Sequence, residues 1–129
     1  MGNRRRSRRS DATKKIALKI EAFIYNQKYI TMRTLLRVTS EVAASNKAIM
    51  DGTFAKVMKS TMESIQPEAS YFLTNEGCRS WIMIFDLKDP SDIPSIAEPF
   101  FFNFNAKVEF CPVMNADDLQ KGLEKAQKS

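Results

Sequence analysis

The segment "EASYFLTNEGCRSWIMIFDL", residues 68–87, carries the clearest pattern in the sequence. Two runs rich in β-branched and aromatic residues, 68–74 and 78–87, flank the tripeptide Asn-Glu-Gly at 75–77. Gly77 can adopt the positive φ that a tight turn requires. The segment therefore predicts a β-hairpin.

The second strand of this hairpin is apolar on both faces. Ile82 and Ile84 alternate with Trp81, Met83 and Phe85. A strand with one face in water would carry polar residues at alternate positions instead. We therefore expect helices to cover one face of the sheet and a second copy of the sheet to cover the other, in an isologous homodimer.

The residues on either side of the hairpin complete an α+β pattern. The other predicted elements are strands at 32–40 and 106–114, and helices at 44–65, 91–102 and from 115 onward. Gly52 inside the first helix predicts a kink or a close approach, and Asn115 is a predicted cap of the last. The order β-α-β-β-α-β predicts a ferredoxin-like fold, with a four-stranded antiparallel sheet and a C-terminal helix.

Charge divides the chain into a basic leader, 1–31, and a single domain, 32–129. The leader holds nine Lys/Arg against two acids (+7), and the domain holds eleven against thirteen (−2). Residues 4–10 have no apolar content and are expected to be disordered. After Asp11, a candidate cap, a helix is predicted from the spacing of four apolar residues: Ile16, Ile20, Phe23 and Ile24.

Three interpretations of the leader remain open. Translation could start at Met32, immediately before the first predicted strand. The leader could be a solvated tail. It could also be a basic arm that binds a partner or nucleic acid through phosphate contacts, the only part of the chain for which nucleic-acid binding is expected.

The amino-acid composition limits the kinds of catalytic and metal-binding site that the chain can form. The chain has no histidine, which removes the commonest general base, the usual activator of a Ser or Cys nucleophile and the favoured ligand of transition metals. Cys78 and Cys111 form neither a disulfide framework nor a metal-binding spacing, so we expect reduced thiols in a cytoplasmic protein. No run of eighteen apolar residues exists, and no membrane span, metal or cofactor is expected.

Several stretches give a resemblance over residues 32–123. "MRTLLRVTSE", "DGT", "PEASYF", "IAEPFFFNFNAKVEF" and "PVMNADDL" are similar to a group of small bacterial proteins of the dimeric α+β barrel, ferredoxin-like class. The resemblance implies the fold and a homodimer, but no activity that can be transferred. Relatives of the class bind small aromatic or acidic molecules, or haem, between helices and sheet. The absence of histidine argues against the haem-binding branch, which needs an axial ligand.

Six residues are candidates for a ligand cleft: Tyr71, Arg79, Trp81, Glu98, Asn103 and Glu109. Glu68 and Arg79 begin the two hairpin strands, so a cross-strand ion pair is expected. Alternatively, the Arg79 guanidinium binds a carboxylate or phosphate.

Each of the other candidates has two interpretations. Glu98, between Ala97 and Pro99, is either a desolvated acid or base or a helix-end carboxylate in water. Asn103 either faces the cleft or ties down loop backbone. Tyr71, Trp81 and Glu109 line either the cleft or the dimer interface.

These observations favour a homodimeric small-molecule-binding module with a cleft between sheet and helices. One alternative is a cofactor-free monooxygenase- or isomerase-like enzyme that uses Glu98 or Glu109 as its base. Another is binding of nucleic acid or a partner through residues 1–31.

Overall fold

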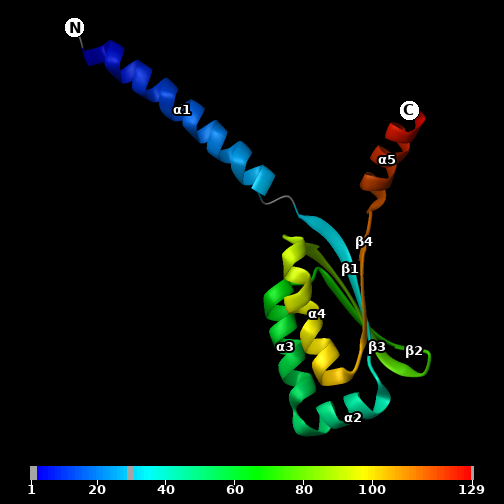
Figure 1. Ribbon diagram of the computed structural model, residues 1–129. Coiled ribbons are helices and arrows are strands. Elements are labelled where there is room, and N and C mark those ends of the chain that lie inside the picture. The colour runs from blue at the N-terminus through cyan, green and yellow to red at the C-terminus, as the bar shows by residue number, and fades with distance from the viewer. Residues whose placement is uncertain (1–2, 29–30, 129) are drawn as a thin grey trace. The chain divides into compact units, whose positions relative to one another are not determined.

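The computed structural model describes the backbone of residues 3–28 and 31–128, and the side chains of 10–22 and 31–128 (Figure 1). The chain divides into two compact units, residues 1–30 and 31–129. Each unit is described by itself below.

The first unit is a helix, α1 (Asn3–Lys28). Its bounds take in residues 4–10, and Asp11 lies inside the helix instead of capping it. Arginine is a strong helix former, which accounts for a helix that extends beyond the apolar positions. Ile16 and Ile20 are exposed, and the side chains of Phe23 and Ile24 lie outside the described residues. Among the described residues, no helix has an apolar stretch long enough to cross a membrane.

The second unit is built on a four-stranded antiparallel sheet in the order β2-β3-β1-β4. Its strands are β1 (Met32–Thr39), β2 (Ala69–Asn75), β3 (Cys78–Leu87) and β4 (Lys107–Pro112). The predicted hairpin is confirmed: β2 and β3 pair from Ala69↔Ile84 to Asn75↔Cys78. Glu76 and Gly77 form the loop, and both have positive φ (53° and 76°), as the tightest hairpin turns require.

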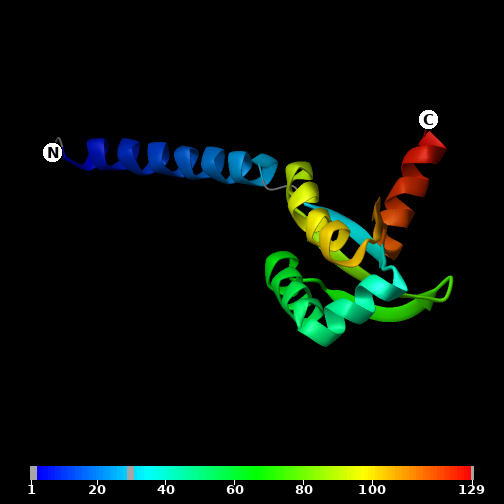
Figure 2. The same ribbon diagram turned by 60° about the horizontal axis from the view of Figure 1, so that its bottom comes forward.

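Helices α2 (Val42–Asp51), α3 (Thr53–Ile65) and α4 (Ile93–Phe104) lie on one face of this sheet (Figures 1 and 2). Gly52, with φ 83°, separates α2 from α3, so the kink predicted within residues 44–65 is a complete break. A short 3₁₀ turn, Pro90–Asp92, precedes α4, and the Asp89 carboxylate accepts a hydrogen bond from its Ser91 N–H at 2.8 Å. The architecture is therefore α+β, as predicted.

The core lies between the helices and the sheet. β1 contributes Leu36 and Val38, and β3 contributes Trp81, Met83 and Phe85, all of them buried. This is the alternation predicted from the sequence. The Trp81 ring meets Phe54 and Phe104 edge-on, with 5.6 Å between ring centroids in each pair.

The opposite face of the sheet, called the open face, carries the alternate residues of each strand. One row across the four strands reads Tyr71, Ile82, Arg37, Glu109. The next row reads Ala69, Ile84, Leu35, Cys111. Ile82, Ile84 and Leu35 are only half-buried, because none of α2, α3 and α4 lies on this side.

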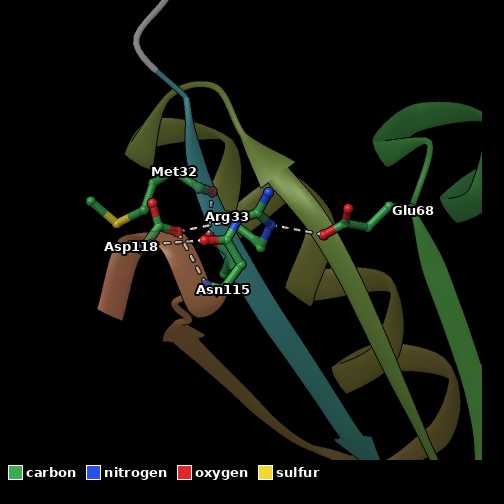
Figure 3. Close-up of polar contacts among 6 residues, drawn as sticks. Met32, Arg33, Glu68, Asn115 and Asp118 are labelled. Carbon is green, nitrogen blue, oxygen red and sulfur yellow. Dashed lines mark hydrogen bonds and ion pairs between the residues drawn. The ribbon is translucent and has the colours of Figure 1, made fainter. Parts of the chain in front are cut away.

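The last helix, α5 (Ala116–Lys128), is joined to the sheet by polar contacts around Arg33 (Figure 3). Arg33 Nη1 donates to Asp118 Oδ2 at 3.1 Å, and Arg33 Nε donates to Glu68 Oε1 at 3.0 Å. Asn115 Oδ1 accepts from the Asp118 N–H at 2.8 Å, which confirms the predicted cap. Leu119 and Leu123, farther along α5, remain exposed.

Candidate functional site

The six sequence-predicted residues do not gather in one cleft. Trp81 is a core residue, 1% exposed, and its Nε1 finds no acceptor among the described residues. Tyr71 and Glu109 lie at opposite ends of one row of the open face, separated by Ile82 and Arg37. Both residues therefore lie on the face opposite the helices and not in a cleft beneath them.

The expected ion pair between Glu68 and Arg79 is wrong. Because the hairpin strands are antiparallel, the start of β2 meets the end of β3: the Glu68 N–H donates to Ile84 O at 2.8 Å. Arg79 instead faces Thr74 at the hairpin turn. The Arg79 Nη1 donates to Ser45 Oγ at 2.8 Å and to Asn46 Oδ1 at 2.6 Å, which ties β3 to α2.

Glu98 and Asn103 are exposed residues of α4. Asn103 Nδ2 donates to Pro99 O at 2.8 Å, so its amide ties down backbone, as one of the two interpretations expected. The neighbouring Asn105, with φ 45°, ends α4 and its Nδ2 donates to the Glu41 carboxylate. These contacts stabilise the end of a helix.

A groove between α3 and α4 has a volume of about 350 Å³. It is lined by nine residues of the two helices: Lys56, Val57, Ser60, Thr61, Ser64, Ile65, Ser95, Ile96 and Pro99. None of the six sequence-predicted candidates lines it. Its floor reaches the core, because Val57 and Ile65 pack against the buried cluster and Ile96 belongs to it.

The α3 side of the groove has two parallel rows, each spaced by four residues and therefore along one side of the helix. The outer row is Lys56, Ser60 and Ser64, and the inner row is Val57, Thr61 and Ile65. Thr61 Oγ1 donates to Val57 O at 2.8 Å, so its hydroxyl is already engaged. The outer row is polar and exposed, and the inner row is mostly apolar.

The α4 side contributes a backbone feature that the other helices lack. Pro99 lies inside α4 and has no N–H, so it cannot donate the helical hydrogen bond to the carbonyl of Ser95. Both residues line the groove. The Ser95 hydroxyl itself donates to Asp92 O at 2.8 Å. On this wall the Ser95 carbonyl therefore lacks its donor at position 99, and the Ser95 hydroxyl is already engaged.

Two smaller cavities, of about 180 and 220 Å³, continue from the groove toward the end of β3. Their charged lining residues are Lys88 with the acids Asp86, Asp92 and Glu68. Because Glu68 is paired with Arg33, the two acids Asp86 and Asp92 against Lys88 give this end a net negative charge. Lys56 is the only charged lining residue of the main groove, so the two ends differ in the sign of their charge.

Two carboxyl groups of the second unit have lowered pKa values, and both lie outside the groove. Hydrogen bonds from the Thr53 side chain and N–H lower the pKa of Asp51, with a smaller contribution from Lys47. Hydrogen bonds from the Ser91 N–H and side chain lower the pKa of Asp89. Both groups stabilise turns at helix starts. Among the described residues, no cluster of Cys, Asp or Glu is arranged to hold a metal ion.

No family model, curated protein or solved structure matches this chain.

Proposed function

We propose that this chain is a homodimeric small-molecule-binding module with a ferredoxin-like fold of the dimeric α+β barrel class. The strand order β2-β3-β1-β4, with helices between β1 and β2 and between β3 and β4, supports the fold assignment. The groove between α3 and α4 is the binding site, and the open face is the dimer interface.

The groove between α3 and α4 is the main support for a small-molecule-binding function. Its volume, about 350 Å³, lies within the range of roughly 300–1,000 Å³ that small-molecule pockets occupy. Like such pockets, it combines an apolar floor, including Val57, Ile65 and Ile96, with a few polar groups at its edge. It lies between two helices and reaches the core, instead of opening between the helices and the sheet.

The open face supports the dimer. Leu35, Ile82 and Ile84 form an apolar centre that the helices leave uncovered, and Tyr71 beside them is 68% exposed. In a two-fold pairing of sheets, burial of these side chains drives association. Arg37 neighbours Glu109 across β1 and β4, so each arginine can meet a glutamate of the second copy.

Helix α5 gives a second reason for a partner. Its Asp118 faces Arg33 of the same chain. Successive helical residues are turned by about 100°, so Leu119 points about 100° and Leu123 about 140° away from Asp118. These leucines, 48% and 55% exposed, are thus directed away from the chain's own sheet. A second copy would bury them.

Sedimentation velocity of the full chain tests the dimer, with Ile82→Lys as the disruptive variant and Ile49→Lys as the control. Ile82 lies at the centre of the open face, whereas Ile49 is exposed on α2. We expect the wild type and Ile49→Lys to sediment as dimers and Ile82→Lys as a folded monomer. A monomeric wild type would remove the dimer from the proposal and leave the groove to be tested separately.

Native mass spectrometry of the full chain purified from its own host tests the groove. Phenylalanine at Ser60 fills the groove, and phenylalanine at Lys59 lies on the exposed side of the same helix. We expect a reproducible added mass on the wild type and on Lys59→Phe, and its loss from Ser60→Phe. An added mass that survives in Ser60→Phe would place the ligand elsewhere.

A further inference from the structure

We propose that the groove between α3 and α4 binds a small amphipathic carboxylate. The carboxylate pairs with Lys56, the hydrocarbon body lies along the inner row of α3, and a donor group such as a hydroxyl meets the carbonyl of Ser95. This inference rests on the proposed binding function and names its ligand class.

The charge of the groove selects an anion. Lys56 is the only charged lining residue, and the residues three and four positions away along α3 (Gly52, Thr53, Lys59 and Ser60) include no acid. No carboxylate therefore neutralises Lys56 from its own helix. Among the described residues, its ammonium group has no ion pair either. A carboxylate that binds it gains a charge-assisted hydrogen bond at the edge of a partly apolar site.

The acidic end of the groove sets the direction of the ligand. Lys88 lies there with Asp86 and Asp92, and Glu68 is already paired with Arg33, so an anion at that end would meet net negative charge. The carboxylate consequently belongs at Lys56, with the body directed toward Ser64 and Ile65.

The two rows on α3 require an amphipathic body. Ser60 and Ser64 follow Lys56 along the exposed edge, and Val57 and Ile65 follow the inner row, which packs against the core. A ligand that lies in the groove buries one side against aliphatic carbon and keeps the other at hydroxyl groups. From Lys56 to Ile65 the helix rises about 13 Å, which allows a chain of medium length.

Pro99 adds the third element of recognition. Pro99 has no N–H, so the Ser95 carbonyl lacks its helical donor at position 99. The Ser95 hydroxyl is engaged with Asp92 O, so this wall presents an acceptor. A carboxylate with a hydroxyl on its chain can pair with Lys56 on α3 and donate to the Ser95 carbonyl on α4. A carboxylate with a plain hydrocarbon chain makes only the first of these contacts.

Isothermal titration of the full chain with octanoate, 8-hydroxyoctanoate and 1-octanol tests the ligand class, with backbone amide NMR shifts to locate each probe; the hydroxyl of the second acid lies at the end of the chain that faces Ser95. Lys56→Gln removes the proposed anion partner. Lys59→Gln is the matched control, because Lys59 is exposed on α3 outside the groove. Both variants remove one positive charge from the same helix.

We expect octanoate to bind roughly tenfold more tightly than 1-octanol, with shifts at Ser60, Ser64 and Ile96. The 8-hydroxy acid should bind more tightly still. Lys56→Gln should weaken both acids by about tenfold and leave 1-octanol unchanged, and Lys59→Gln should leave all three unchanged.

Two outcomes would overturn the inference in different ways. If 1-octanol binds the wild type as tightly as octanoate, or Lys56→Gln has no effect on the acids, the ligand class is wrong while the groove remains a binding site. If none of the probes shifts the groove residues, both this inference and the assignment of the groove as the binding site fail.

Discussion

Replacing Trp81 by phenylalanine is expected to leave the free energy of unfolding nearly unchanged, although Trp81 is the largest fully buried side chain. The indole N–H, buried without an acceptor among the described residues, is the reason. Such a group costs about 1–3 kcal/mol, and phenylalanine removes it. The new ring keeps edge-on partners in Phe54 and Phe104.

The smaller side-chain volume of phenylalanine lowers the free energy of unfolding and opposes this gain. Phenylalanine is smaller than tryptophan by roughly 40 Å³, and at about 24 cal/mol per Å³ the cavity costs about 1 kcal/mol. Less apolar surface is buried as well, which costs about 1 kcal/mol more at roughly 25 cal/mol per Å². The gain and the losses are of similar size, so the net change stays within about 1 kcal/mol. Trp81→Ala, which loses all three ring contacts, should cost about 3–5 kcal/mol.

Urea unfolding followed by far-ultraviolet circular dichroism measures both changes, since neither variant retains the tryptophan fluorophore. All samples need the same protein concentration, because a dimer's apparent stability depends on it. A loss above about 2 kcal/mol in Trp81→Phe would show that the indole N–H is satisfied, and the reasoning would then be wrong.

Three further predictions concern the second unit. Gly52→Ala should lower the free energy of unfolding by about 1 kcal/mol in urea titrations. The cause is the backbone, because φ is 83° at this position, and not crowding, because no atom lies within 4 Å of the added Cβ. An unchanged urea midpoint would mean that α2 and α3 can join without a left-handed residue. Asn115→Ala should cost about 1 kcal/mol through loss of the cap on α5, with Gln120→Ala on the same helix as the control that should not. The lowered pKa of Asp89 contributes stability that is present above the ordinary value of 3.8 and is lost as pH falls through the folded pKa. Asp89→Asn should therefore lose less stability between pH 7 and pH 3 than the wild type, and equal losses would contradict the role of the Ser91 hydrogen bonds.

The strands could be predicted because the pattern that indicates them lies within each strand's own sequence. Alternation between Trp81, Met83 and Phe85 and the intervening isoleucines places each side chain on a face of β3, whatever the rest of the chain does. The break at Gly52 is similarly local, since it follows from the conformational freedom of one residue.

The site could not be predicted in the same way, because it depends on how two helices approach each other. Ser60 and Ser64 read as ordinary exposed positions, and only the opposing wall of Ser95 and Pro99 turns them into a groove. The available signal was the spacing of small hydroxyl residues by four along α3. The ion pair expected between Glu68 and Arg79 was wrong for a related reason. Both residues stand where their strands begin in the sequence, but in an antiparallel hairpin the start of β2 lies beside the end of β3.

The central place of β1 constrains the order in which the chain can fold. The β2–β3 hairpin closes through a two-residue loop and can form early, but β1 must then pair with β3 across the intervening helices, from Met32↔Leu87 to Thr39↔Ser80. Its other edge stays unpaired until β4, the last strand, is in place. A nascent or truncated chain that ends before residue 107 thus exposes the backbone of a hydrophobic strand that the finished sheet encloses. Such an edge readily pairs with other chains, so incomplete copies of this protein should aggregate where the complete one folds.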